Sequence, residues 1–551
     1  MKINTINRVC YNYNNTVSAS NKSERSGQNI NFEALTKSYN KIMHIVMDGV
    51  GIKDSVSTNP ILGNMPFLTG MKHNAFGMTL FRPVEAAGRF VGLEDGEPGN
   101  SEVGHGVMGT GRNIKQAMVR LDEALEDGSF FENKEFLNAM NYAKKNKSTL
   151  HILSSIGYSH THSKLEHIEA LIKMARENGV KNLAVHAFLN GDGPTSSSSI
   201  QYLNKLNLIL KENGYPQVAS IIGRSIALDK SGDSSRIEQG YRMLVDGSNS
   251  LQVDNINEGL KRQLENHVGV EIPATIVKGS PRISDNDAVI FANYRTDRPK
   301  GLTASLAYKD TNYEFVKKGH RPENLYFVTM TEYDPKFQLP TALDTMKYSG
   351  TLKEELLERG WHITSCAQKE KHSHVTFFYN GSKDIIHKNL KDIKLPGCVD
   401  PEKLPESLRE QVEILEQEMT NNTDKKHFIV ANLANGDIIG HKGNPKLSVK
   451  AAQDIDKAVF DLVQHAIAND YAVVISADHG NIENGLSTKH TENPVPCFVI
   501  LPEHETEIKN GLVKIDERAE AALRDIAPTI LDIAGLANGN AMTGKSLLIE
   551  G

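Results

Sequence analysis

Three short apolar runs, each leading to an aspartate, constrain the fold of this chain more than any other feature. The aspartates are Asp48, Asp437 and Asp478. An apolar run closed by acidic residues and glycine is typical of a buried strand in a parallel sheet. Because ligands bind beyond the carboxyl ends of such strands, we expect the three carboxylates to meet at one site. That site would join segments that lie far apart in the sequence.

The block between the first run and the later two has a strand and helix rhythm of its own. Strands are expected near residues 149–153, 183–189, 217–222 and 288–292, and helices at 164–178 and 235–246. This alternation predicts a second α/β domain inserted into the first.

We therefore predict an α/β protein in four parts. These are an N-terminal extension at 1–40, a first part of the parallel-sheet domain at 41–115, an inserted domain at 116–344, and the rest of the sheet domain at 345–551. Connections near 113–118 and 340–346 would then act as paired hinges.

Composition narrows the function classes. The net charge of -6 gives no overall attraction to nucleic acid, and no apolar run is long enough to span a membrane, so partners of both kinds are not expected. The four cysteines lack metal-binding spacing, which suits a reducing compartment such as the cytoplasm. The Asn-rich residues 1–31 favour an unstructured extension over an organelle-targeting peptide, which stays the alternative. We expect a monomer.

Ser101 stands in a glycine-rich stretch, Gly99-Asn-Ser-Glu-Val-Gly-His105. Glycines around one hydroxyl let the backbone approach a ligand closely and present a side chain sharply. Ser101 is therefore a candidate nucleophile, although a turn serine would look the same.

Histidines accompany the later aspartates. Asp437 and His441 are four residues apart, which puts them on one face if the segment is helical, and His479 directly follows Asp478. His490 lies in the next loop. Mixed Asp and His ligands suit Mn²⁺, Zn²⁺ or Mg²⁺, and a site with two such ions can bind a phosphoryl oxygen and activate a hydroxyl.

The sequence resembles a known family, the cofactor-independent (2,3-bisphosphoglycerate-independent) phosphoglycerate mutases of the alkaline phosphatase superfamily. The resemblance runs from about Lys41 to the C-terminus. The strings that carry it are Ala86–Leu93, Gly99–His105, Glu126–Asn133, His374–Gly381 and Ala477–Asn481.

The resemblance implies an alkaline-phosphatase-like domain with an inserted phosphotransferase domain. It implies a glycolytic isomerase that interconverts 3-phosphoglycerate and 2-phosphoglycerate through a phosphoserine on Ser101, without 2,3-bisphosphoglycerate. It also implies two divalent ions, Mn²⁺ in the first place and Mg²⁺, Co²⁺ or Zn²⁺ as alternatives. One ion would be held by Asp437, His441 and His490, and the other by Asp48, Ser101, Asp478 and His479.

The resemblance also implies residues for a small anionic phospho-carboxylate. Lys371 matches a lysine that assists phosphoryl transfer and contacts substrate. The other matched substrate-binding positions are His160, Arg224, Lys230, Arg295 and Arg298.

Departures from the family pattern cluster in the inserted domain. In Asn190-Gly191-Asp192-Gly193, an Asp stands where the family has Arg, and a Gly where it has an acid. Lys230 replaces an arginine, and Ser155-Ile-Gly-Tyr158 stands where the family has Ser-Asp-Gly-Gly. Asp192 is thus a candidate substrate position of changed charge. A related phosphomutase, phosphotransferase or phosphatase for another small phospho- or phosphono-carboxylate remains the alternative, while retention of every metal-site position disfavours an inactive homologue.

Overall fold

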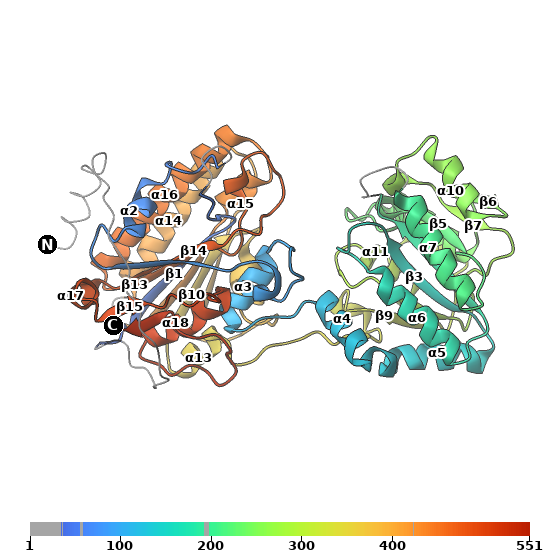
Figure 1. Ribbon diagram of the computed structural model, residues 1–551, viewed down its shortest axis with the longest axis horizontal. Coiled ribbons are helices and arrows are strands. Elements are labelled where there is room, and N and C mark those ends of the chain that lie inside the picture. The colour runs from blue at the N-terminus through green and yellow to red at the C-terminus, as the bar shows by residue number, and fades with distance from the viewer. Residues whose placement is uncertain (1–34, 36, 55–58, 192–197, 423) are drawn as a thin grey trace. The chain divides into compact units, whose positions relative to one another are not determined.

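The computed structural model describes residues 35, 37–54, 59–191, 198–422 and 424–551. The chain divides into two compact units (Figure 1). Unit 1 comprises Met1–Lys115 and Met346–Gly551, and unit 2 comprises Gln116–Thr345. The extension predicted at residues 1–40 lies almost wholly outside the described residues. Its end belongs to the fold, because Tyr39 is buried and its backbone N–H donates to the Ile533 carbonyl.

Unit 1 is built on a seven-stranded sheet in the order β11-β10-β12-β1-β13-β14-β2. The first five strands run parallel, and β14 is antiparallel to both of its neighbours. The sheet is thus mixed, where the sequence predicts a parallel one. The strands are β1 (Lys41–Met47), β2 (Thr79–Val84), β10 (His362–Gln368), β11 (Leu390–Leu395), β12 (His427–Leu433), β13 (Ala472–Ser476) and β14 (Val495–Ile500).

Helices cover both faces of this sheet (Figure 1). On one face lie α2 (Pro66–Lys72), α14 (Leu404–Asn421) and α16 (Pro445–Ala468), and on the other α3 (Ser101–Thr110), α13 (Leu352–Glu358) and α18 (Ile526–Ile533). Every residue of β12 is buried, and so is every residue of β13. Burial on both faces explains why these strands read as continuous apolar runs. Smaller elements are α15 (Asn435–Gly440), α17 (Glu505–Lys509), β15 (Val513–Ile515) and β16 (Leu548–Glu550).

Unit 2 has its own seven-stranded sheet, in the order β6-β7-β5-β4-β3-β8-β9, with β7 antiparallel to β5. The strands are β3 (Leu150–Ile156), β4 (Leu183–Leu189), β5 (Ser220–Gly223), β6 (Leu251–Val253), β7 (Thr275–Val277), β8 (Ala288–Phe291) and β9 (Tyr326–Thr329).

The helices of unit 2 contribute buried apolar side chains to two clusters, which also contain strand residues. The first cluster contains residues of α4 (Ala117–Asp127), α5 (Lys134–Asn146), α6 (Leu165–Glu177), α7 (Ser198–Glu212) and α10 (Ile256–Leu264). The second contains residues of α8 (Arg224–Ala227), α9 (Ser234–Val245), α11 (Lys300–Leu306) and α12 (Glu314–Lys318). Each unit is therefore an α/β sandwich, as the sequence predicts.

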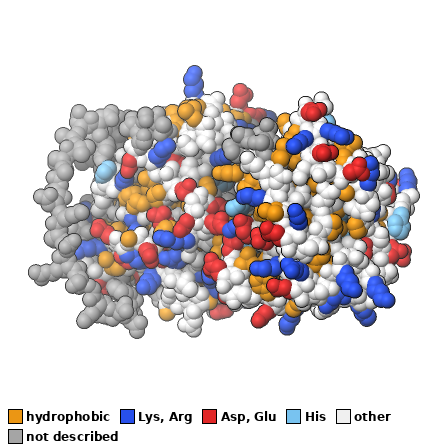
Figure 2. Space-filling view, turned by 45° about the vertical axis from the view of Figure 1, so that its right-hand side comes forward, with side chains coloured by type: hydrophobic (Ala, Val, Ile, Leu, Met, Phe, Trp, Pro, Cys, Tyr) orange, Lys and Arg blue, Asp and Glu red, His pale blue; other side chains and the backbone are white. Residues whose placement is uncertain are grey.

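On the face shown in Figure 2, acidic and basic side chains of the described residues are interspersed. Within the described ranges, no helix combines the length and the apolar character needed to cross a membrane.

A chain of buried polar groups crosses the core of unit 2. Asp287 Oδ2 accepts from His151 Nε2 at 3.1 Å, and His151 Nδ1 lies 2.9 Å from His186 Nε2. His186 Nδ1 in turn lies 2.7 Å from the Ser220 hydroxyl. The Asp287 carboxylate fixes His151 Nε2 as a donor, and a neutral pair then satisfies every group if the Ser220 hydroxyl donates to His186 Nδ1. Protonation of both rings would place two N–H groups against each other. Burial lowers the pKa of His151, and burial together with the nearby His151 and Arg282 lowers the pKa of His186 further.

Acid should therefore destabilise unit 2. Below about pH 6.5, the unfolded chain binds protons at these two histidines that the folded chain does not, so the free energy of unfolding falls as the pH falls. Between about pH 7.5 and about pH 5.5 we expect a loss of up to about 3 kcal/mol, which is the limit for two histidines that stay neutral when folded. Hydrogen exchange at β3 and β4 measures it. The exposed His267→Gln variant should show the same slope, whereas pH-independent exchange free energies at these strands would contradict the prediction.

Candidate active site

Three neighbouring strand ends of unit 1 bring the predicted aspartates together. β1 lies between β12 and β13 in the sheet, and all three strands are parallel. Asp48 follows β1, Asp437 stands in the first turn of α15 after β12, and Asp478 comes two residues after β13. All three carboxylates are buried. The strand order thus joins segments that the sequence separates.

Ser101 is the first residue of α3 and faces these carboxylates. The side chain of Asn100 caps the helix by accepting from the Val103 N–H at 3.1 Å. The Ser101 hydroxyl donates to Asp48 Oδ1 at 3.4 Å and lies 3.0 Å from His479 Nε2. A hydroxyl at a helix N-terminus among ionisable groups is placed to meet an anion.

Lys371 connects the serine to two of the aspartates. Its ammonium donates to Ser101 Oγ at 2.7 Å, to Asp48 Oδ1 at 2.9 Å and to Asp437 Oδ2 at 2.8 Å. Burial opposes this charge, but the carboxylates outweigh burial and raise the pKa of Lys371. Lys371 is therefore a charged donor at neutral pH, which is suited to holding a phosphoryl oxygen.

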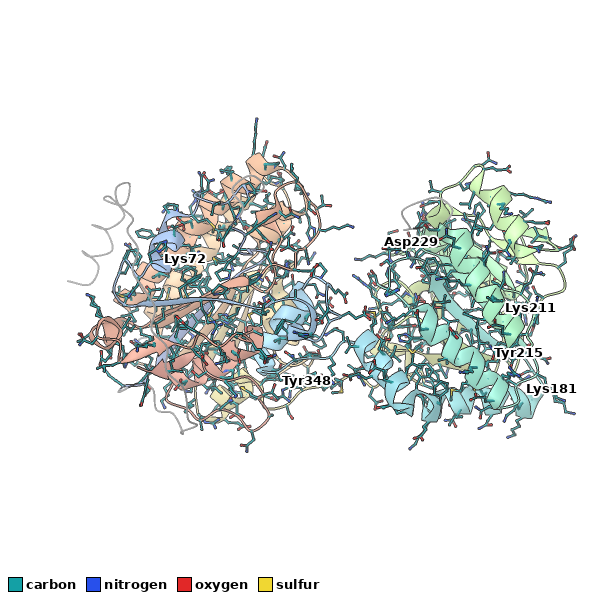
Figure 3. The ribbon with its side chains drawn as sticks, viewed as in Figure 1. Lys72, Lys181, Lys211, Tyr215, Asp229 and Tyr348 are labelled. Atoms are coloured by element: carbon teal, nitrogen blue, oxygen red, sulfur yellow. The ribbon has the colours of Figure 1, made fainter. Side chains whose placement is uncertain are left out.

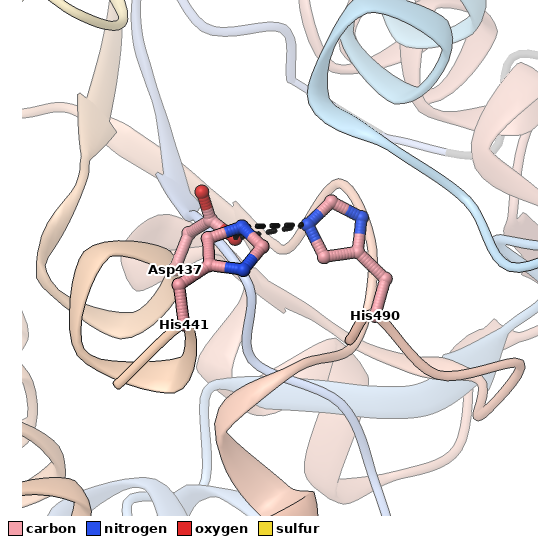
Figure 4. A group of neighbouring side chains, drawn as sticks. All are labelled: Asp437, His441 and His490. Carbon is pink, nitrogen blue, oxygen red and sulfur yellow. Dashed lines mark hydrogen bonds and ion pairs between the residues drawn. The ribbon is translucent and has the colours of Figure 1, made fainter. Parts of the chain in front are cut away.

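One group of possible metal ligands is drawn in Figure 4. His441 Nε2 and His490 Nε2 each lie 3.2 Å from Asp437 Oδ1, and the two nitrogens lie 3.2 Å apart. The other nitrogen of each ring faces a backbone carbonyl, which fixes the orientation of the ring. His441 Nδ1 lies 2.8 Å from the Thr488 carbonyl, and His490 Nδ1 lies 2.8 Å from the Gly99 carbonyl. An Nδ1–H that donates to a carbonyl leaves the Nε2 lone pair free for a metal.

A second group consists of Asp48, Asp478 and His479. Burial and the charge of Asp478 raise the pKa of Asp48. Asp478 Oδ2 is buried and accepts no hydrogen bond, because His105 Nδ1, 3.3 Å away, lies closer to the Ser101 carbonyl at 2.8 Å. Carboxylates whose repulsion is only partly compensated by Lys371, and a carboxylate oxygen that accepts no hydrogen bond, fit a bound cation. The residues of both groups therefore suit divalent ions.

Of the predicted substrate residues, Lys371 lies in unit 1, and four others gather in unit 2 near Asp297 and His162. Arg295 Nε lies 3.1 Å and Lys230 Nζ 3.6 Å from the Asp297 carboxylate, and Arg298 is close enough to lower its pKa. Arg224 donates to His162 Nε2 at 2.9 Å. We call Arg224, Lys230, Arg295 and Arg298 the basic cluster. Such a group of guanidinium and ammonium groups can bind a small anion.

The basic cluster lies at the edge of unit 2 where the parallel strands end. Asp229, beside Lys230, is found at this edge in Figure 3, whereas Lys211 and Tyr215, at the end of α7, lie toward the opposite edge. This is the edge at which α/β sheets bind ligands.

Two predicted substrate positions differ from the rest. Asp192 lies outside the described residues. His160 is exposed, and two residues later His162 is buried beside Arg224 with its Nδ1 unpaired. Burial and the neighbouring arginines lower the pKa of His162 to about 3, so it is neutral. The sequence reasoning missed His162, although both histidines stand in one His-Thr-His string.

Comparison with known proteins shows the family of this chain. Residues 121–335 match the family described as BPG-independent PGAM N-terminus, and residues 319–520 match type I phosphodiesterase / nucleotide pyrophosphatase. The 2,3-bisphosphoglycerate-independent phosphoglycerate mutase of Listeria welshimeri is 35% identical over 480 residues, which cover 84% of this chain and 91% of that protein. The chain belongs to the 2,3-bisphosphoglycerate-independent phosphoglycerate mutase family. The resemblance inferred from the sequence is thus confirmed.

Other members agree with this assignment. The enzyme of the same name from Parabacteroides distasonis is 34% identical over 524 residues, 92% of this chain and 99% of that protein. A crystal structure of Leishmania mexicana phosphoglycerate mutase has a TM-score of 0.72 and 24% identity, and covers 94% of this chain and 98% of that one, so the fold is shared. The chain is a phosphoglycerate mutase-like enzyme of the isomerase class, within the alkaline phosphatase superfamily.

The site of this mutase-family chain also contains polar residues that sequence reasoning missed. Asn432 donates to Asp48 Oδ2 at 2.5 Å and lies 3.0 Å from His105 Nε2. Asn481 donates to Asp437 Oδ1 at 2.9 Å. The sequence could have indicated Asn432, because it is a lone amide inside an apolar strand sequence. For Asn481, the sequence offers no indication beyond its position shortly after Asp478.

Loss of one imidazole should empty one metal position. In His490→Ala, only Asp437 and His441 remain of the first group, so we expect the metal-stripped protein to take up one tightly bound Mn²⁺ instead of two. Electron paramagnetic resonance of free Mn²⁺ during titration counts the bound ions. The exposed His73→Ala variant should bind like the wild type. Uptake of both ions by His490→Ala would remove His490 from the ligand set.

Proposed function

We propose that this chain interconverts 3-phosphoglycerate and 2-phosphoglycerate through a phosphoserine on Ser101, with two Mn²⁺ ions. The observation that carries the proposal is the position of the Ser101 hydroxyl, 2.7 Å from Lys371 Nζ and 3.0 Å from His479 Nε2. The relatives named as phosphoglycerate mutases support the choice of substrate.

The two ligand groups suggest where the ions bind. Asp437, His441 and His490 would hold one ion. Asp48, Asp478 and His479, together with the Ser101 hydroxyl, would hold the other. When bound, such ions supply Lewis-acid polarisation of a phosphoryl group and lower the pKa of a nearby hydroxyl.

In the first half of the reaction, Ser101 Oγ gives up its proton and forms a bond to phosphorus. The bond between phosphorus and the substrate oxygen breaks, and that oxygen takes up a proton, which leaves glycerate and phosphoserine. Lys371 and the N-terminal end of α3 both present positive charge to the transferring group. In the second half, the other hydroxyl of glycerate attacks the phosphoserine and the same steps run in reverse.

The outcome depends on keeping water from the phosphoserine. Water would release phosphate and turn the mutase into a phosphatase. Ser101 is 7% exposed and His479 is fully buried. This burial favours transfer back to glycerate over hydrolysis.

The basic cluster of unit 2 is the proposed site for the negative charges of the substrate. Guanidinium groups bind carboxylates and phosphates in a fork geometry, and the cluster supplies Arg224, Arg295 and Arg298. His162 adds a neutral ring with an unpaired Nδ1 beside Arg224. A phosphoglycerate carries both anionic groups that such a cluster recognises.

One set of residues favours a second candidate substrate. Asp192 and Gly193 replace the arginine and the acid of the family pattern, and Tyr158 is 60% exposed in the loop that leads to His160. An anion in place of a cation weakens binding of a carboxylate. Another small phospho- or phosphono-carboxylate is therefore the alternative substrate for the same chemistry.

Replacing Ser101 tests the proposed nucleophile. We expect Ser101→Ala to lose phosphoenzyme formation and to lower turnover by roughly a thousandfold or more, because no other group takes the phosphoryl. ³¹P NMR of the Mn²⁺-loaded protein with 3-phosphoglycerate follows the 2-phosphoglycerate signal, and mass spectrometry of quenched protein detects the phosphoserine. The exposed Ser349→Ala variant should match the wild type. Full activity of Ser101→Ala would exclude this nucleophile.

The wild-type spectrum also separates the candidate functions. Growth of 2-phosphoglycerate without free phosphate supports the mutase, whereas phosphate alone indicates a phosphatase. An unchanged spectrum from metal-loaded protein would favour the alternative substrate.

Restoring the family residues tests specificity. Asp192→Arg with Gly193→Asp should raise kcat/KM for 3-phosphoglycerate by about tenfold, the value of one charge-assisted hydrogen bond. Asp192→Asn with Gly193→Asp is the matched control, because it removes the negative charge without supplying a guanidinium. If the arginine variant gains nothing over this control, the loop does not contact substrate in the family manner.

A further inference from the structure

Glu483 is a buried carboxylate that the proposed chemistry does not use. It stands in the short 3-10 helix Ile482–Asn484 after Asp478 and His479, and its exposed fraction is 0%. Among the described residues, no lysine, arginine or histidine forms an ion pair with it. A buried carboxylate of this kind is costly unless hydrogen bonds satisfy it.

Four donors satisfy this carboxylate, and they come from three loops. Oε2 accepts from the backbone N–H of Gly51 at 3.0 Å and of Asn481 at 2.9 Å. Oε1 accepts from the Thr491 hydroxyl and from Asn493 Nδ2, the latter at 2.9 Å. Hydrogen bonds to a charged acceptor are stronger than neutral ones, so the four bonds hold the three loops firmly.

Each of these loops carries a metal-ligand candidate. Gly51 lies three residues after Asp48, Asn481 two residues after His479, and Thr491 directly after His490. The side chain of Asn481 also donates to Asp437 Oδ1 at 2.9 Å, which adds the loop of α15.

The backbone of two loops lies directly against the carboxylate. A side chain at Gly51 or at Gly480 would collide with the Glu483 carboxylate. Glycine at these two positions lets the backbones of two loops approach the carboxylate directly.

We infer that Glu483 is a positioning residue that sets the mutual geometry of both metal-ligand groups. Its four hydrogen bonds go to residues outside the two ligand groups, so it acts through the loops that carry Asp48, His479 and His490. This inference rests on the metal centre of the proposed function, and it assigns the preorganisation of that centre to one carboxylate.

The test compares Mn²⁺ affinity among variants of the full chain. Glu483→Ala leaves two buried backbone N–H groups without an acceptor and should weaken Mn²⁺ binding about 10- to 100-fold in isothermal titration calorimetry. Glu483→Gln should fall between Glu483→Ala and wild type. A glutamine oxygen can still accept from Gly51 and Asn481, and the Thr491 and Asn493 side chains can reverse their roles.

Asp456→Ala is the matched control. Asp456 is also a buried acid of unit 1, but its carboxylate accepts the backbone N–H groups of Phe67 and Leu68 in α2, at 3.0 and 2.9 Å. This variant should lower thermal stability and keep the wild-type Mn²⁺ affinity. Equal losses of affinity in both alanine variants would reduce Glu483 to a general structural role and overturn the inference.

The remaining outcomes separate this inference from the proposed function. Wild-type affinity in Glu483→Ala, or in Glu483→Gln if the alanine variant does not fold, would overturn the role of Glu483 alone. Absence of Mn²⁺ binding by the wild-type chain would overturn the proposed metal centre, and this inference with it.

Discussion

Electrostatic repulsion among three buried carboxylates is the constraint on which the structure of unit 1 depends. Asp48, Asp437 and Asp478 converge where three parallel strands end. Such a group is unstable without positive charge nearby, because burial strengthens repulsion as well as attraction. Lys371 supplies one compensating charge through bonds of 2.9 and 2.8 Å to Asp48 and Asp437. The unpaired Oδ2 of Asp478 indicates that this compensation is incomplete, and a site for cations follows from it.

The two units use opposite electrostatic arrangements. Unit 1 presents carboxylates and imidazoles, a donor set for metal ions, around a single hydroxyl. Unit 2 presents the basic cluster at the carboxyl edge of its sheet and keeps its core histidines neutral. Carboxylates and imidazoles are groups that bind cations, whereas guanidinium and ammonium groups bind anions.

Short loops, as well as the sheet, position the residues of the candidate metal site. The strands bring their ends within reach, but His490 lies in a loop between β13 and β14. Its ring is oriented by the Gly99 carbonyl, and its loop is held by Glu483 through Thr491. Loops held in this way can carry ligands with the accuracy that metal coordination demands.

The sequence by itself determined the chemical character of the site. Apolar runs closed by Asp48, Asp437 and Asp478 predicted buried strands, and the β12 and β13 runs proved buried throughout because both faces of the sheet are covered. The strings around Ser101 and Asp478 determined the family. Only the tertiary structure decided which of two nearby histidines is buried beside Arg224, and that Glu483 joins three loops. The physical reason is the distance along the sequence between the interacting residues. Periodicity and composition report local burial. Hydrogen bonds between distant loops depend on strand order and on how closely the backbones approach, and no local sequence pattern encodes either.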